Sequence, residues 1–273
     1  MRTPRTITLL VTGLALVLGL AACDPGTVGI RFDPSVGDTY RFRSDISTRV
    51  LRTIDEETTV EDADSVLDAT EVVTAVDGDE IAVAVTLERD GATQRSYEVR
   101  FDRGDRLTAI DLVEGVPADA LGLDLANDLP ADIASPPAGP LEPGETWEIR
   151  RVVEVAGRPD PIVIEGVGRV DSLGVVDGND VAVVVVELSV PIRSVIETSD
   201  GTVTVVGMQS SASRTTYDLE DGAAREDRTD ITGDVDVIVQ PPDGIEADPV
   251  EGEIRYEIET RTVRVAVDSA GND

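Results

Sequence analysis

Apolar and polar residues alternate at period two through much of this chain, and that alternation constrains its fold more than any other feature. The clearest alternating segments are residues 40–50, 81–87, 97–101 and 254–258. A period of two places alternate side chains on opposite faces of a strand, which is typical of antiparallel sheets with one buried and one solvated face. After Arg261 the apolar residues shift by one position, to Val263 and Val265, which predicts a β-bulge there.

Only one segment favours a helix. Residues 117–127 read PADALGLDLAN, with Pro near the start and Leu121 and Leu125 four positions apart, so they predict one short helix. Residues 130–142 follow and are rich in Pro. Pro lacks a backbone donor and does not occur within central strands, so this stretch is predicted to be a linker.

Three short stretches before this linker have counterparts after it, in the same order. The pairs are VGDTYRFR (36–43) with PGETWEIR (143–150), VDGDEIAVAV (76–85) with VDGNDVAVVV (176–185), and YEVRFDRGDR (97–106) with TTYDLEDGAA (215–224). Repeated landmarks in a fixed order favour an internal duplication over chance. The predicted fold is therefore mainly β, with antiparallel sheets in two related halves and one short helix between them. The first repeat spans 32–129, the second spans 143–267, and 268–273 form a tail.

The first 22 residues have the features of a secretory signal peptide. Two Arg residues precede an apolar run that is too short to span a bilayer, and small residues follow it. Leu20-Ala21-Ala22-Cys23 resembles the lipobox of bacterial lipoproteins, which implies cleavage between Ala22 and Cys23 and lipidation of Cys23. An ordinary signal peptide followed by an unmodified Cys is the alternative. Residues 23–31 would then form a lipid-anchored tether that holds the protein on the outer side of the cell membrane.

The charge of the chain argues against some partners. It contains 55 acidic and 23 basic residues, with a formal net charge of −32. Binding to nucleic acid or to anionic head groups requires a positive surface, so neither is expected.

The residue inventory also excludes several kinds of catalysis. The chain has no His, and Cys23 is its one Cys, which excludes Ser-His-Asp triads, Cys-His pairs and zinc sites of His and Cys. A glycosidase with two carboxylates remains possible in principle, but 55 acids make chance pairs unavoidable. We therefore predict a protein that is not an enzyme, with no catalytic residue and no cofactor.

The repeated acidic turns raise the possibility of calcium sites. Asp77, Asp79 and Glu80 lie in the first turn, and Asp177 and Asp180 lie in the second. Calcium loops of the EF-hand type need more ligands than these turns supply before the next apolar strand begins. Asp-Gly is instead a strong signal for a hairpin turn, so we predict turns and no metal site.

The lipobox, the Gly-acid-Thr-aromatic openings of both halves and the VDG strands together resemble a family of secreted actinobacterial lipoproteins of unknown function with a repeated β-rich unit. At the level of architecture the chain is similar to carriers in which a curved antiparallel sheet surrounds a lipid-binding cavity. The anchor, the β repeat and the missing catalytic residues together favour a non-enzymatic, lipid-anchored binding or interaction module of the cell envelope. The alternative is a carrier of a lipid or another apolar ligand.

Overall fold

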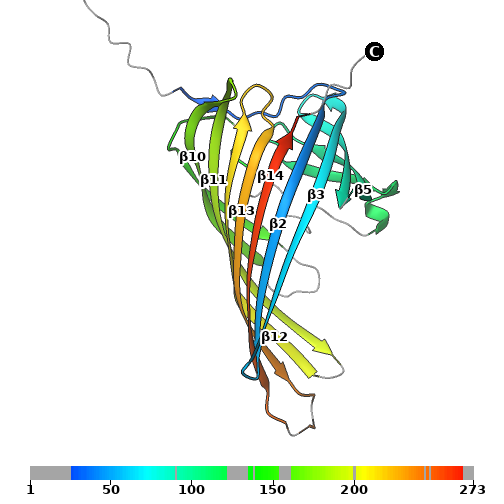
Figure 1. Cartoon of the computed structure of the whole chain (residues 1–273), viewed down its shortest axis with the longest axis vertical. Helices are drawn as coiled ribbons and strands as arrows, with labels where there is room; N and C mark the ends of the chain where they lie inside the picture. The colour runs from blue at the N-terminus through cyan, green and yellow to red at the C-terminus, as the bar shows by residue number, and fades with distance from the viewer. Residues whose placement is uncertain are drawn as a thin grey trace, which may run out of the picture.

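The computed structural model describes residues 26–266, except 90, 122–134, 138, 154–160, 199–200, 243 and 246. Figure 1 shows long strands that run from a wide end, at the top, to a narrow end, at the bottom. The strands are β1 (Val28–Gly29), β2 (Thr39–Ile54), β3 (Glu57–Asp77), β4 (Glu80–Arg89), β5 (Ala92–Phe101), β6 (Leu107–Val113), β7 (Val116–Pro117), β8 (Pro140–Leu141), β9 (Thr146–Val153), β10 (Ile162–Val176), β11 (Asn179–Thr198), β12 (Gly201–Asp218), β13 (Ala224–Gln240) and β14 (Val250–Val265). The prediction of a mainly β protein with antiparallel sheets is confirmed.

Twelve of the described strands form one sheet, in the order β7-β6-β5-β4-β3-β2-β14-β13-β12-β11-β10-β9. Strand β14 pairs with β2 from Gly252↔Ile54 to Val265↔Arg41. The last described strand of the chain is therefore joined to the first long one, and the two sides of the sequence belong to a single sheet.

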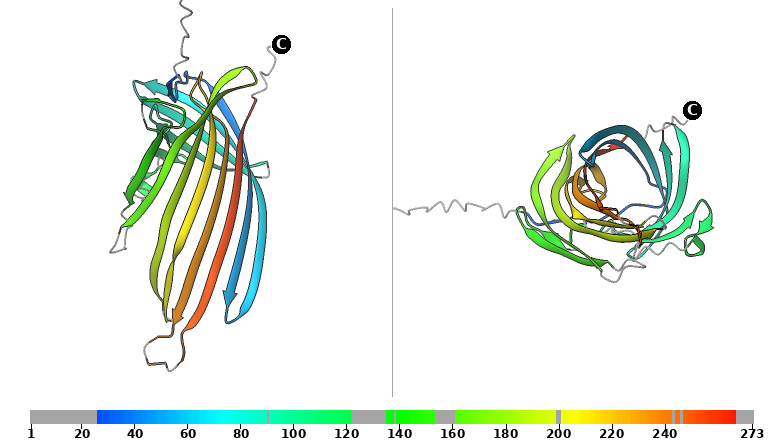
Figure 2. Two further views of the ribbon diagram at one scale, coloured as in Figure 1. Left: turned by 90° about the vertical axis from the view of Figure 1, so that its left-hand side faces the viewer. Right: turned by 90° about the horizontal axis from the view of Figure 1, so that it is seen from below.

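The sheet curves around one of its faces, as the view from below in Figure 2 shows. We call this the inner face, and it carries Tyr40 on β2 and Val83 on β4. Residues directly opposite each other in an antiparallel pair lie on the same face. The pairs Val83↔Val73 and Tyr40↔Glu71 therefore lie on the inner face. From them, the strand register assigns every other paired residue to the inner or the outer face.

A short N-terminal segment, residues 28–33, crosses the wide end of the sheet; we call it the strap. It includes β1, in which Val28 pairs with Leu141 of β8. Val28, Ile30 and Phe32 are buried. Residues 28–31 of the predicted tether at 23–31 lie in the strap. The predicted linker at 130–142 likewise contains a buried residue, Leu141.

Two local predictions differ from the structure. Within the predicted helix at 117–127, the described residues form a single 3-10 turn, Asp119–Leu121, while 122–127 lie outside the described residues. The predicted bulge after Arg261 is wrong, since β14 pairs with β2 without a break as far as Val265. The apolar phase shifts there because Arg264 occupies an inner position, where it pairs with carboxylates.

Candidate functional site

The strap closes the wide end of the sheet through backbone hydrogen bonds to both sides of the molecule. The Phe32 N–H donates to the carbonyl of Arg103 at 2.9 Å, and the Asp33 N–H donates to the carbonyl of Asp221 at 2.9 Å. Gly222 has a φ of +71°, and a Cβ there would lie 1.9 Å from the Arg31 carbonyl oxygen. Only Gly combines this backbone conformation with so close an approach of the strap.

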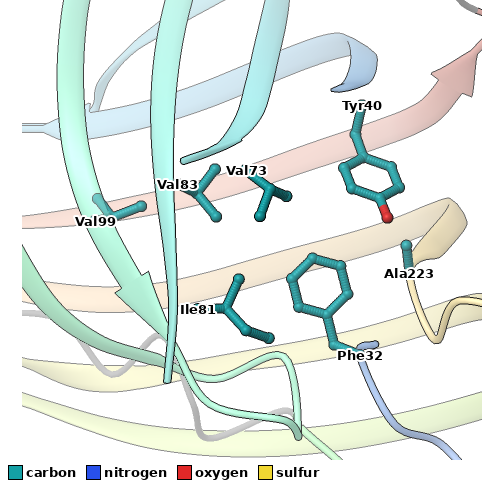
Figure 3. Close-up of a cluster of buried hydrophobic side chains, with 7 residues drawn as sticks. All are labelled: Phe32, Tyr40, Val73, Ile81, Val83, Val99 and Ala223. Atoms are coloured by element: carbon teal, nitrogen blue, oxygen red, sulfur yellow. The ribbon is translucent and has the colours of Figure 1, made fainter. Parts of the chain in front are cut away.

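Two apolar clusters lie beneath the strap. Figure 3 shows the first, in which the ring of Phe32 packs near Tyr40 and Ile81, with a ring-centroid distance of 5.8 Å between Phe32 and Tyr40. It contains Phe32, Tyr40, Val73, Ile81, Val83, Val99 and Ala223. The second contains Val28, Ile30, Ala182, Val184, Val186 and Tyr217. The strap supplies side chains to both clusters, so one segment covers the inner face of both sides of the sheet at this end.

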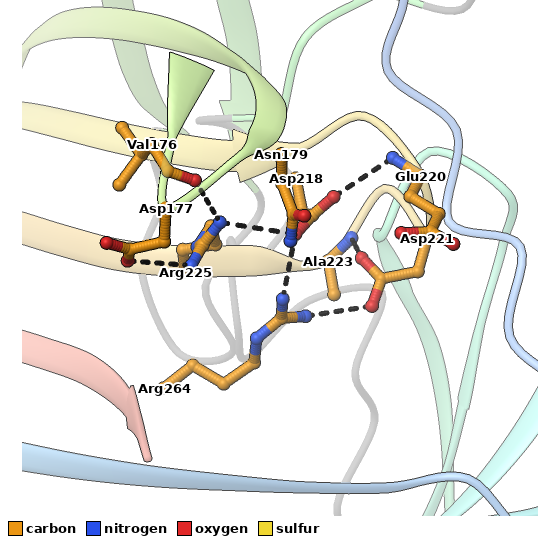
Figure 4. Close-up of polar contacts among 9 residues, drawn as sticks. All are labelled: Val176, Asp177, Asn179, Asp218, Glu220, Asp221, Ala223, Arg225 and Arg264. Atoms are coloured by element: carbon orange, nitrogen blue, oxygen red, sulfur yellow. Dashed lines mark hydrogen bonds and ion pairs between the residues drawn. The ribbon is translucent and has the colours of Figure 1, made fainter. Parts of the chain in front are cut away.

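A polar cluster beside these residues fixes the loops at the wide end of the sheet (Figure 4). We call this end, with its strap, the closed end. Asp218 is only 2 % exposed and accepts a hydrogen bond from the Arg264 guanidinium at 3.1 Å and another from the Asn179 amide at 3.2 Å. Arg264 also donates to Asp221 at 2.8 Å, and Arg225 reaches both Asp218 and Asp177. Because the Asp221 carbonyl receives the Asp33 N–H, this cluster holds the loop on which the strap rests.

Two further carboxylates face the closed end without a guanidinium partner among the described contacts. Glu71 lies opposite Tyr40 on the inner face, and desolvation raises the pKa of its carboxyl to about 7. Protein atoms surround Asp105 on most sides, although it keeps some solvent contact. Desolvation, followed by the nearby charge of Glu71, raises the pKa of Asp105 to about 8. These two acids are the described carboxyls with raised pKa values.

A row of hydroxyl groups crosses the inner face below the closed end. Ser44 and Thr262 lie opposite each other, with their oxygens 2.7 Å apart. Thr215 and Thr229 both donate to Asp227, at 2.6 and 2.9 Å. The Asp227 carboxylate therefore has one partner on its own strand, β13, and one on the neighbouring strand β12, as a partly buried charge requires.

Beyond this row the inner face of β11–β14 carries no charged side chain as far as the narrow end; we call this surface the trough. Its residues, assigned by strand register, are Leu188, Val190, Ile192, Ser194 and Ile196 on β11, Val203, Val205, Gly207, Gln209 and Ser211 on β12, Ile231, Gly233, Val235, Val237 and Val239 on β13, and Val250, Gly252, Ile254, Tyr256 and Ile258 on β14. The outer face of the same strands carries acids and Arg at many positions, among them Asp234, Arg255 and Glu257. On the neighbouring strands β2 and β3, Arg52 and Glu61 also occupy inner positions. They form an ion pair with an N–O distance of 3.3 Å.

The trough is open along most of its length. Val235 is buried, but Leu188, Ile231 and Ile258 remain partly accessible, and Ile196 is 51 % exposed. This accessibility shows that no described element packs over the trough as a continuous second layer. An aliphatic face that water reaches and no described segment covers is suited to bind an apolar molecule.

One aromatic side chain lies flat along the floor of the trough. A Cβ on Gly233 would come within 2.1 Å of the Tyr256 ring, so the ring lies directly over this glycine. The Tyr256 hydroxyl reaches the next strand and donates to Gln209 Oε1 at 2.8 Å. Gly233 therefore leaves room for the Tyr256 ring to lie against the sheet, and the hydrogen bond to Gln209 holds the ring in this position.

Three hollows, of about 520, 470 and 450 Å³, open on the other side of the sheet. Most of the side chains that line the first belong to the outer face, including Asp45, Arg228 and Arg261. They are open grooves between charged side chains. The candidate site is therefore the trough on the inner face.

The residues singled out from the sequence fall outside this site. Ala22 and Cys23 lie outside the described residues. The two acidic turns form two-residue hairpins, at Gly78-Asp79 between β3 and β4 and at Asp177-Gly178 between β10 and β11. In the described part of the chain, no group of three or more acidic or Cys side chains is placed to hold a metal ion.

Sequence reasoning missed the trough, although a signal for it was present. Residues 231–239 and 250–258 place apolar or Gly residues at every inner position, while several of the intervening positions carry acids. The pattern predicted a buried face, and it could not show that this part of the face has no cover.

The sequence matches no family model and no curated protein. Among solved structures, it is similar to Pseudomonas aeruginosa OccK11 (OpdR), with 8 % identity, coverage of 84 % of this chain and 97 % of that chain, and a TM-score of 0.25. OccK2 (OpdF) of the same organism gives 9 % identity, coverage of 84 % and 98 %, and a TM-score of 0.22. Scores this low carry no argument about function. Within the described residues, no helix is long and apolar enough to span a membrane.

Proposed function

We propose that this protein is a lipid-anchored lipoprotein of the cell envelope that binds the hydrocarbon part of an amphiphile in the trough and catalyses no reaction. The observation that carries this proposal is the uncharged, partly accessible inner face of β11–β14, which no described segment covers. Contact with water makes such a face costly, and a bound hydrocarbon chain would recover about 25 cal/mol for each Å² of apolar surface removed from water.

The size of the trough fits this class of ligand. From Ser213, which lies opposite Thr229 of the hydroxyl row, to Val203 near the narrow end, β12 advances ten residues, or about 33 Å at roughly 3.3 Å per residue. One leaflet of a bilayer is about 15 Å thick in its hydrocarbon part. The trough is therefore long enough to hold an entire acyl chain.

We also propose that the sheet arose by duplication, with β2–β6 related to β9–β13. Matching hydrogen bonds support this proposal. Gly37 donates to the Val73 carbonyl at 2.9 Å, and Gly144 donates to the Val170 carbonyl at 2.7 Å. A register shift follows directly after both Val73 and Val170.

The binding proposal is tested by native mass spectrometry of the mature chain with Cys23 replaced by Ser, after incubation with phosphatidylcholine vesicles. We expect lipid to be retained by this protein. Ile231→Asp places a charge in the trough and should abolish retention, because an unpaired charge is costly in an apolar environment. The matched control is Thr232→Asp, which places the same charge on the outer face and should retain lipid. A protein that never retains lipid, or that retains it equally in both variants, would contradict the proposal.

The anchor is tested separately in cells. Cys23→Ala should move the protein from the membrane fraction to the soluble or secreted fraction, because lipidation would hold it at the bilayer. A variant that stays fully membrane-bound would refute lipidation of Cys23.

A further inference from the structure

We infer that the ligand enters and leaves the trough at its narrow end, remote from the strap; this inference rests on the proposed binding function. We call this end the tip. It is formed by the turn between β2 and β3, the hairpin of β11 and β12, and the loop between β13 and β14, and it lies at the bottom of Figure 1.

The two ends of the inner face differ in their cover. At the wide end, the strap places Phe32 and Ile30 in the two apolar clusters, and its backbone bonds to Arg103 and Asp221 hold it there. A hydrocarbon chain passing this end would have to displace the strap and disturb the buried contacts of both clusters.

At the tip, the same face ends in aliphatic side chains without a cover among the described residues. Ile54 and Ile196 are 47 % and 51 % exposed. Strand register places Val237 and Val205 on the inner face between these two strands. Hydrocarbon that enters beside the acidic β2–β3 turn, which carries Asp55 and Glu56, meets Ile196 and Val203 on the hairpin and continues along the trough without crossing a charge on β11–β14.

The position of the tip also separates it from the proposed anchor. Val28 in the strap follows Cys23 by five positions in the sequence, which limits their separation to about 18 Å. The tip lies at the other end of β11, a strand of 20 residues and therefore about 65 Å long. Ligand exchange at the tip would thus take place well away from the point of attachment to the anchoring membrane.

The experiment measures the rate of transfer of pyrene-labelled phosphatidylcholine from phosphatidylcholine vesicles to the mature chain with Cys23 replaced by Ser, by stopped-flow fluorescence. Val203→Asp places a charge on the inner face at the tip and should slow transfer by at least about tenfold, because hydrocarbon must pass an ionised group. Thr204→Asp places the same charge on the outer face of the same strand and should leave the rate within about twofold of the unmodified value.

A second variant tests the opposite end. The Arg103 side chain donates to the carbonyls of Gly78 and Phe32, so Arg103→Ala loosens the strap. We expect its transfer rate to remain within about twofold of the unmodified rate. Circular dichroism and urea unfolding establish that each variant is folded before its rate is compared.

The possible failures are distinguishable. Absence of transfer to the unmodified protein would defeat the binding function itself. Transfer that is unchanged by Val203→Asp, or that is accelerated severalfold by Arg103→Ala, would leave the binding function standing and overturn the assignment of the tip as the entry point.

Discussion

The closed end and the trough are built from the same alternating strands, yet both apolar clusters lie at the closed end. Val184 and Val186 on β11 are each 2 % exposed, while Leu188, on the same face of the same strand, is partly accessible. The strap accounts for this difference, because Val28 and Ile30 pack with Val184 and Val186. An alternating sequence thus determines which side chains share a face, and a separate segment determines how much of that face becomes core.

The sharpest way to break this comparison is to truncate one Ile at each end. Ile81 is fully buried in the first apolar cluster, so Ile81→Ala should lower the free energy of unfolding by about 4 kcal/mol. Ile258 lies in the trough and already contacts water, so Ile258→Ala should cost only about 1 kcal/mol. Urea unfolding of the ligand-free protein measures both values. Equal losses would show that the trough is packed as tightly as the closed end.

The polar cluster of the closed end provides the next test. Asp218→Ala removes the shared partner of Arg264, Arg225 and Asn179, and it should destabilise the protein by about 3 kcal/mol. This value lies at the lower end of the range for buried ion pairs, because Arg264 retains Asp221 and Arg225 retains Asp177.

The matched control is Asp171→Ala on the outer face. Asp171 accepts hydrogen bonds from two exposed Arg side chains, and its loss should destabilise the protein far less than the loss of Asp218. If both variants lost the same stability, the cluster at the closed end would be no more important than a surface ion pair.

The sequence predicts much of the sheet and little of its cover. The alternation at 40–50 and 254–258 identifies β2 and β14 directly, because period two has no helical interpretation. The bulge expected after Arg261 is absent because Arg264 can occupy an inner position once Asp218 and Asp221 lie beside it. Those acids are more than 40 residues away in the chain, and their proximity is a product of the fold.

The strap could not be predicted for a similar reason. Its hydrogen bonds join Phe32 to Arg103 and Asp33 to Asp221, across about 70 and 190 residues of chain. Nothing in the local sequence of residues 28–33 distinguishes a packed segment from the continuation of a tether. The alternation predicts that the residues of the trough share one face of the sheet. Whether water reaches that face depends on where the strap ends.

The last test concerns pH and sharpens the comparison at the closed end. Desolvation raises the pKa of Glu71 to about 7, above the value of about 4.3 for an unfolded chain. The folded protein therefore binds more protons than the unfolded chain between about pH 4 and 7, and Glu71 lowers stability progressively as the pH rises through this window. Asp105, with a pKa of about 8, acts in the same direction up to a slightly higher pH.

Glu71→Gln should consequently remove part of this pH dependence. We expect the variant to match the parent near pH 4.5 and to be more stable at pH 8, in urea unfolding measured at several values between them. Glu57→Gln removes one negative charge at an exposed position and controls for the general repulsion of a chain with a net charge of −32. If the curves for Glu71→Gln and the parent ran parallel from pH 4.5 to 8, Glu71 would be solvated like a surface acid. The closed end would then be as open to water at this position as the trough.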